Sequence, residues 1–162
     1  MRRVAVIGCG GAGKTTVARA LALHTGLPLV QADPIVYADG HTARPESEWQ
    51  PELNAHADRD AWVIDAMKLS LLEHRVQRAD TVVFVDVARR WCFLGVVQRD
   101  GLQALRNHAF MRWIWDFPRQ ARPRIYELLE RYNGDTRVVV LRSRRDVRGF
   151  LATLRRDGAV VG

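Results

Sequence analysis

The sequence predicts an α/β protein with the P-loop nucleoside-triphosphate hydrolase fold, in which a five-stranded parallel sheet carries helices on both faces. Short apolar runs alternate with longer helical patterns, which is typical of a parallel sheet covered on both sides. A glycine-rich loop of the phosphate-binding type follows the first apolar run. The length of 162 residues fits one domain, which we expect to span residues 1–162.

The elements follow from these patterns in chain order. The predicted strands are Val4–Gly8, Leu27–Val30, Trp62–Asp65, Thr81–Asp86 and Arg137–Leu141. The predicted helices are Lys14–His24, Glu46–Arg59, Leu69–Arg78, Arg89–Arg99, Leu105–Tyr132 and Arg145–Arg155. Thr25-Gly26 is a stop for the first helix, since glycine adopts the left-handed cap conformation. Pro118 lies inside the long fifth helix, where we expect a kink or a break.

The segment Gly8–Thr15 fits the phosphate-binding pattern G-x-x-x-x-G-K-[ST] at every position. Glycines let backbone N–H groups converge on a phosphate, and the positive end of the following helix adds to the attraction. We expect Lys14 to contact the β- and γ-phosphates of ATP, and the Thr15 hydroxyl to bind Mg²⁺. The predicted nucleotide-binding residues of the loop are Gly8, Gly10, Gly11, Ala12, Gly13, Lys14, Thr15 and Thr16.

The same loop also fits the dinucleotide motif G-x-G-x-x-G through Gly8, Gly10 and Gly13. Asp33 follows about 20 residues later, where that fold places a ribose-binding acid. Against this alternative, Lys14 occupies a position at which the dinucleotide-binding helix usually packs on its sheet. The chain is also short for a six-stranded dinucleotide fold with a catalytic domain, so the P-loop interpretation is favoured.

Three acidic residues follow predicted strands, at the end where ligands of open parallel sheets bind. Asp65 ends an apolar strand, as expected of a Walker B carboxylate that holds Mg²⁺ through water. Asp33 is placed to orient or deprotonate an acceptor hydroxyl. Asp86 follows the fourth strand. The alternative for each is a helix cap or a turn residue, which aspartate favours.

A short lid over the phosphates is expected at about residues 99–122, where arginines could neutralise the charge that develops during phosphoryl transfer. Arg99 ends the helix at which such a lid begins, and Arg119 and Arg122 follow on one face of the next helix if Pro118 only bends it. The alternative is that these are surface arginines without substrate contact. The predicted catalytic residues are Lys14, Asp33, Arg99, Arg119 and Arg122.

The net charge of +7 is concentrated in the second half, where sixteen arginines face eight acidic residues from Val82 onward. Such a half can surround a phosphate site or bind a polyanion such as nucleic acid, and the alternative is solvated surface. The sequence has no helix-turn-helix or zinc-finger pattern, so we expect any nucleic-acid binding to be weak and non-specific. Its only cysteines, Cys9 and Cys92, exclude a disulfide framework and a four-cysteine zinc site.

No apolar run approaches the roughly 20 residues of a membrane helix, and the first apolar stretch is too short for a signal peptide. We therefore expect a cytoplasmic protein without membrane contact, as a monomer or a homodimer.

Several segments together resemble the adenylate-kinase-like P-loop proteins of the DNA topology modulation (FlaR) type. The resemblance rests on the glycine loop, Trp62–Asp65, Ala79–Asp86, the tryptophan-rich stretch Trp113–Pro118 and the ending from Val140 through Leu151. It covers nearly the whole chain. It implies the sheet order 2-3-1-4-5 and a loop at Arg142 and Ser143 near the adenine of ATP.

The chain departs from that family on the acceptor side. Asp65 is followed by Ala66-Met67-Lys68, where the family usually continues Asp-Gly-Asn-Tyr. Gln31-Ala32-Asp33 stands in place of His-Leu-Asp, and only Asp100–Phe110 joins two helices between which the family carries a longer basic insertion. The acceptor is therefore not implied by the resemblance.

The leading interpretation is an ATP- and Mg²⁺-dependent kinase that phosphorylates a small acceptor, such as a nucleotide or a small alcohol. One alternative is a nucleotide-regulated protein whose basic half binds nucleic acid. The other is a nucleoside triphosphatase that uses water as its acceptor. Function belongs to sites and not to folds, so the acceptor pocket decides among the three.

Overall fold

The computed structural model describes residues 1–37 and 42–158. Five parallel strands form one sheet in the order β2-β3-β1-β4-β5, as predicted. The strands are β1 (Arg3–Gly8), β2 (Leu29–Gln31), β3 (Trp62–Asp65), β4 (Thr81–Val85) and β5 (Arg137–Leu141). The helices are α1 (Lys14–Thr25), α2 (Ala32–Val36), α3 (Glu46–Ala57), α4 (Leu72–Arg78), α5 (Arg89–Asp100), α6 (His108–Arg131) and α7 (Arg144–Gly158), with short 3₁₀ turns η1 (Leu69–Leu71) and η2 (Leu102–Arg106).

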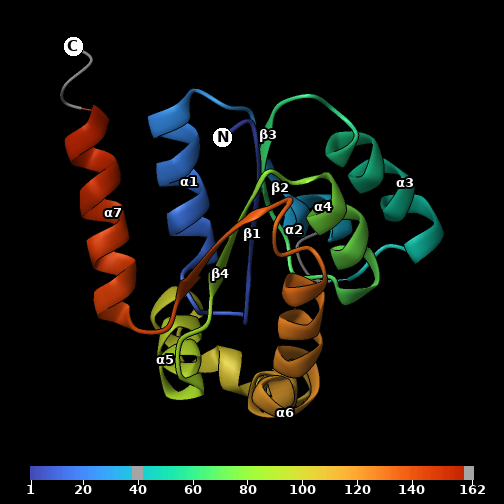
Figure 1. Cartoon of the computed structure of the whole chain (residues 1–162). Coiled ribbons are helices and arrows are strands. Elements are labelled where there is room, and N and C mark those ends of the chain that lie inside the picture. Colours follow the sequence, from blue (N-terminus) through green and yellow to red (C-terminus); the bar gives the residue numbers. More distant parts are fainter. Residues whose placement is uncertain (38–41, 159–162) are drawn as a thin grey trace.

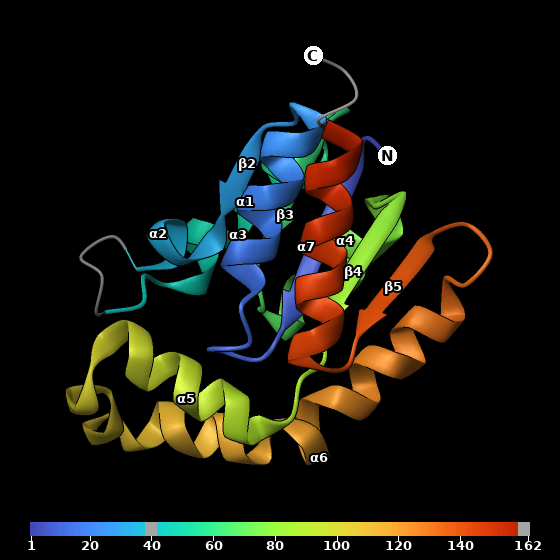
Figure 2. The ribbon, with the colours of Figure 1, turned by 90° about the vertical axis from the view of Figure 1, so that its left-hand side faces the viewer.

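Helices cover both faces of the sheet. Helices α1 and α7 lie side by side on one face, whereas α3 and α4 cover the other (Figures 1 and 2). Helices α5 and α6 pack against each other beyond the carboxyl ends of the strands (Figure 2). None of the helices in the described part of the chain is both long and apolar enough to cross a membrane.

The central strand β1 is the core of the sheet, and its residues Val4–Ile7 are fully buried. The parallel register places Val6 beside Asp65 of β3, and Gln31 of β2 beside Asp65 on its other side. Because all strands run the same way, the glycine loop, Asp65 and the segment after β2 emerge at one edge of the sheet. This is the edge at which open α/β sheets bind ligands.

The elements differ from the predictions mainly at their ends. The strand β2 lies slightly later than predicted, and the short helix α2 that follows it was not predicted. Pro34 lies in the first turn of α2, where backbone N–H groups have no hydrogen-bond partner within the helix. The N–H group that proline lacks is therefore not needed there. The predicted stop at Gly26 is confirmed, since this residue has a left-handed φ of 71°.

The long helix α6 contains both Pro118 and Pro123 and is continuous from His108 to Arg131. The helix α6 changes direction along its length (Figure 2), and it is not broken at Pro118. Proline removes an intrahelical hydrogen bond and clashes with the preceding turn, which accounts for the bend.

Candidate functional site

The glycine loop joins β1 to α1 and curls through left-handed backbone conformations at Gly11 (φ 73°) and Gly13 (φ 94°). Only glycine adopts these angles without strain, so the motif is required by the backbone path itself. The ammonium of Lys14 donates to the carbonyl oxygen of Cys9 over 3.0 Å, across the loop. The ammonium of Lys14, which is predicted to bind phosphate, is therefore held beside the loop.

Thr15 and Asp65, predicted as the two Mg²⁺ residues, are in direct contact. The Thr15 hydroxyl donates to Oδ2 of Asp65 over 2.6 Å. Asp65 is only 7% exposed, and burial raises the pKa of its carboxyl, while the Lys14 charge and the Thr15 bond oppose that rise. A hydroxyl and a carboxylate are oxygen donors of the kind that Mg²⁺ prefers, so these residues fit the ion. No cluster of three or more His, Cys, Asp or Glu side chains suited to a metal occurs in residues 1–37 and 42–158. A site with few protein ligands is the usual one for Mg²⁺ bound with a nucleotide.

The loop rests directly on helix α5. A Cβ atom added at Gly95 of α5 would lie 2.1 Å from the carbonyl oxygen of Gly11. A Cβ atom added at Gly11 would lie 2.1 Å from the carbonyl oxygen of Cys92. Two glycines thus allow the loop backbone and the helix backbone to touch without an intervening side chain.

Cys9 and Cys92 fill the space beneath the loop, and both are buried. A hydrogen bond with the Cys92 thiol, and then burial, raise the pKa of the Cys9 thiol far above its ordinary range. The protonated Cys9 is therefore a packing group, because a reactive cysteine needs a stabilised thiolate.

An open cavity of about 1000 Å³ lies over the loop. Its floor is formed by residues 10–16, and its walls come from three directions. One wall carries Asp33 and Tyr37, together with the turn at residues 65–69 after β3. Another carries Trp91 and residues 98–99 of α5. The third wall carries Phe110 and Trp113 of α6 and Arg144, Val147 and Arg148 of α7.

Most of the predicted site residues meet at this cavity. Gly10 through Thr16, Asp33, Asp65 and Arg99 all line it. Arg99 is also bound to its neighbour Asp100, over 2.7 Å. The hydrogen bond with Asp100 raises the pKa of Arg99, and the nearby charge of Asp33 contributes to that rise. The predicted site residues that do not line the cavity are Gly8, Arg119, Arg122, Arg142 and Ser143.

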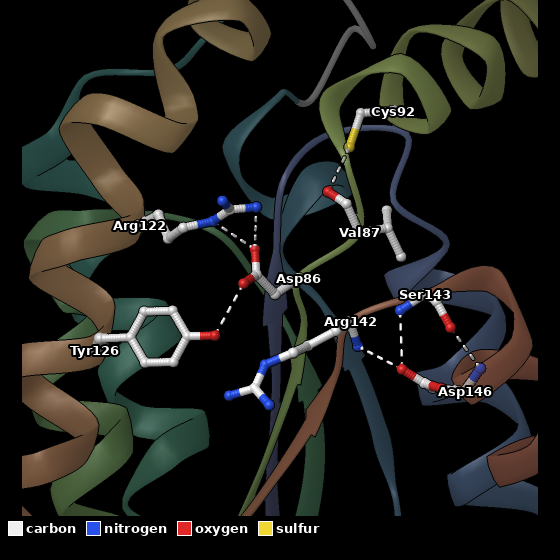
Figure 3. A network of polar contacts seen from close by, with 8 residues as sticks. All are labelled: Asp86, Val87, Cys92, Arg122, Tyr126, Arg142, Ser143 and Asp146. Carbon is white, nitrogen blue, oxygen red and sulfur yellow. Dashed lines mark hydrogen bonds and ion pairs between the residues drawn. The ribbon is translucent and has the colours of Figure 1, made fainter.

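Arg122 is occupied by an ion pair with Asp86, the acid that follows β4 (Figure 3). Its Nε and Nη2 atoms both lie 2.7 Å from Oδ1 of Asp86, and the Tyr126 hydroxyl donates to Oδ2 over 2.9 Å. The Asp86 side chain is buried, so these are desolvated, charge-assisted bonds. In this structure Asp86 and Arg122 anchor the second half of α6 to the sheet, while Arg119 is exposed.

Arg142 and Ser143 immediately precede α7 (Figure 3). The Ser143 hydroxyl accepts from the backbone N–H of Asp146 over 3.1 Å, and the Asp146 carboxylate accepts from the N–H groups of Arg142 and Ser143, both over 3.0 Å. This reciprocal arrangement is a capping box. It turns the next residue, Arg144, and one helical turn later Arg148, towards the cavity.

Two groups of lining residues were missed from the sequence. One is Trp91 with Arg144, whose guanidinium lies 4.9 Å from the centroid of the indole. The other is Phe110 and Trp113, which are stacked with centroids 5.9 Å apart. Trp113 shares a helical face with buried residues such as Phe117, so its position in the sequence does not distinguish it from a core side chain. The spacing of Phe110, Trp113 and Phe117 indicates a common face, but not which end of that face meets a cavity.

No protein-family model matches this sequence, and no curated protein is significantly similar to it. Solved structures of kinases are similar in fold. A shikimate kinase from Acinetobacter baumannii in complex with shikimate has a TM-score of 0.65 at 16% identity, covering 96% of this chain and 92% of that chain. A gluconokinase from Sinorhizobium meliloti 1021 has a TM-score of 0.58 at 18% identity, and the match covers 99% of this chain and 95% of that chain. A deoxyadenosine kinase from M. mycoides with bound dATP has a TM-score of 0.56 at 12% identity, and the match covers 94% of this chain and 97% of that chain. The chain therefore shares its fold with these kinases over nearly all of its length.

Proposed function

We propose that this protein is an ATP-dependent kinase that transfers the γ-phosphoryl group, with Mg²⁺, to a hydroxyl group of a small acceptor. The observation that carries the proposal is the meeting of Lys14, the Thr15–Asp65 pair and Asp33 at one cavity. The structural similarity to a shikimate kinase, a gluconokinase and a deoxyadenosine kinase supports the reaction class. These three act on different acceptors, so the similarity leaves the acceptor open.

The loop and its neighbours would bind the nucleotide. Backbone N–H groups of the loop and Lys14 hold the phosphates, and Thr15 and Asp65 would hold Mg²⁺. The ion, when bound, neutralises charge on the β- and γ-phosphates. The base of ATP fits the side of the cavity that carries Trp91 and Arg144, since an indole and a guanidinium both stack on purines.

Asp33 would act on the acceptor. Its carboxylate makes no hydrogen bond to any residue within 1–37 and 42–158, although its charge contributes to the pKa shifts of Asp65 and Arg99. A carboxylate without a partner at the cavity can accept the proton of an acceptor hydroxyl as its oxygen attacks the γ-phosphorus. Phe110 contacts the loop, because a Cβ added at Gly10 would lie 2.6 Å from its ring. It would help to exclude water.

The test is ADP release with ATP and Mg²⁺ over a panel of nucleosides, nucleoside monophosphates and small alcohols. We expect one acceptor class to raise ADP release above the rate with water, and Lys14→Ala to abolish the increase. Asp33→Asn should lower transfer by roughly 10²–10⁴-fold with ATP affinity nearly unchanged, because it removes the base and keeps the shape. Background hydrolysis should fall far less. Hydrolysis that no acceptor increases would instead favour a nucleoside triphosphatase.

We also propose that the protein is related to the adenylate-kinase-like proteins of DNA topology modulation type, which its sequence resembles. Residues 1–162 would form one catalytic domain, with a lid at residues 99–122, working in the cytoplasm as a monomer or a homodimer. Arg119, Arg122, Arg142 and Ser143 keep their proposed roles only if the lid and the start of α7 rearrange around bound nucleotide. Weak nucleic-acid binding by the basic half remains the second candidate, and its salt dependence tests it.

A further inference from the structure

A lysine that the nucleotide site does not use lies on the acceptor side of the cavity. Lys68, in the turn after β3, lines the cavity together with Asp33 and Tyr37. Its ammonium lies 5.1 Å from the centroid of the Tyr37 ring and 5.4 Å from that of Trp49. Tyr37 and Trp49 belong to the segment around α2 and α3, across the loop from α7 (Figure 1). Lys68 therefore lies far from the side of the cavity that is proposed to bind the adenine of ATP.

A buried arginine fixes the turn that carries Lys68. Arg75 of α4 is only 1% exposed, and its Nη2 atom donates to the carbonyl oxygens of Lys68 over 3.3 Å and Ala66 over 3.5 Å. Burial lowers the pKa of Arg75 to about 10, while the charge of Asp65 opposes that fall. The Nε and Nη1 atoms of Arg75 are buried without a hydrogen-bond partner among the described residues, so the two carbonyls of the turn are the groups that this guanidinium bonds.

The Lys68 ammonium lacks an anionic partner within the described residues. No carboxylate of residues 1–37 or 42–158 forms an ion pair with it, whereas Arg99 at the same cavity is paired with Asp100. Its hydrogen bond to the Tyr37 hydroxyl is long, at 3.4 Å. An ammonium has three N–H donors, so at least two remain for a ligand, and the Tyr37 hydroxyl can donate to the same ligand.

We infer that Lys68 and the Tyr37 hydroxyl bind an anionic group of the acceptor, a carboxylate or a phosphate, while Asp33 faces its hydroxyl group. The acceptor is then a hydroxylated anion and not a neutral alcohol or nucleoside. This inference rests on the proposed function, since it takes the same cavity as the transfer site. Lys68 is the residue that selects the acceptor, because a neutral compound would leave its charge without a partner.

Calorimetric binding of matched probes tests the inference, with the loop first filled by saturating Mg·ADP. The carboxylate pair is D-gluconate and neutral D-glucitol, and the phosphate pair is adenosine 5′-monophosphate and adenosine. We expect the anion of one pair to bind at least tenfold more tightly than its neutral partner, and the responding pair identifies the group. Lys68→Met should remove that preference, because a charge-assisted hydrogen bond is lost. Lys68→Arg should keep most of it.

The control is Arg59→Met, which removes one positive charge from the exposed turn between α3 and β3. It should leave the preference unchanged and so exclude a general effect of net charge. Equal affinities within both pairs, no binding by any probe, or a preference that survives Lys68→Met would overturn the inference. Failure of Mg·ADP to bind would instead overturn the proposed function, while the gluconate–glucitol comparison would still report on Lys68.

Discussion

Replacing Gly95 by alanine adds one methyl group where helix α5 touches the phosphate loop. The new Cβ would lie 2.1 Å from the carbonyl oxygen of Gly11, whereas ordinary van der Waals contact begins at 3.4 Å. Both partners are backbone, so no side chain can move aside, and either the loop or the helix must shift. Gly149, in the interior of α7, is the matched control, because a Cβ there meets nothing within 4 Å.

Gly149→Ala should stabilise the protein, whereas Gly95→Ala should leave its stability unchanged or lower it. Alanine is favoured over glycine in a helix by about 1 kcal/mol, so Gly149→Ala should raise the free energy of unfolding by about that amount. Gly95→Ala gains the same helical preference but incurs an overpacking cost of about 1–3 kcal/mol. It should therefore be about 1–3 kcal/mol less stable than Gly149→Ala.

Urea unfolding measures this difference, and calorimetric titration with Mg·ADP measures its effect on the loop. We expect Gly95→Ala to weaken nucleotide binding about tenfold or more, because the loop carbonyl at Gly11 is displaced, and Gly149→Ala to leave it unchanged. Equal stability of the two variants, together with unchanged nucleotide affinity, would refute the argument that the loop rests on α5.

Three further predictions concern other parts of the molecule. Lys14→Ala should weaken Mg·ATP binding at least tenfold, or about 1.4 kcal/mol, and an unchanged dissociation constant would contradict the nucleotide site. Burial opposes ionisation of Asp80, but its carboxylate accepts from the backbone N–H groups of Arg2 and Arg3 and from a neighbouring threonine hydroxyl, so its pKa lies below the ordinary value. Such an acid stabilises the folded state above its unfolded pKa, and this contribution is lost as the pH falls through the folded pKa. Asp80→Ala should therefore lower the free energy of unfolding by about 1–3 kcal/mol at pH 7, with a smaller difference in acid, and a pH-independent difference would contradict the assignment. Any nucleic-acid binding should weaken steeply as salt rises, and tight sequence-selective binding in high salt would favour the nucleic-acid hypothesis over the kinase.

The fold was predictable because its signals are local. Continuous apolar runs mark buried strands, and the glycine motif specifies the turn between β1 and α1. The contact between Thr15 and Asp65 was also predictable, since the register of adjacent parallel strands brings the ends of β1 and β3 together. The helix α2 was missed because Asp33 and Pro34 are poor helix formers that are tolerated only in a first turn.

The pairings of arginines were not predictable from spacing. Arg122 and Asp86 are 36 residues apart in the sequence. They meet because α6 brings Arg122 back to the acid that follows β4 (Figure 3). Helical periodicity showed that the lid arginines share a face, but not that this face is anchored to an acid. The role of Lys68 depends likewise on Tyr37 and Trp49, which reach it from elements that are distant in the sequence.

The bend in α6 has a consequence for the proposed lid. The missing N–H groups of Pro118 and Pro123 leave no helical hydrogen bond to the carbonyls of Ile114 and Arg119. The segment after Pro118 is anchored to the sheet, because Arg122 and Tyr126 both bond to Asp86, whereas the segment before Pro118 carries Phe110 against the loop. A hinge at Pro118 would therefore let the first half of α6 swing away without breaking the bond between Arg122 and Asp86. The energetic cost of such an opening would fall on the contact of Phe110 with the loop, and the proposed nucleotide would enter while the core of the protein stays intact.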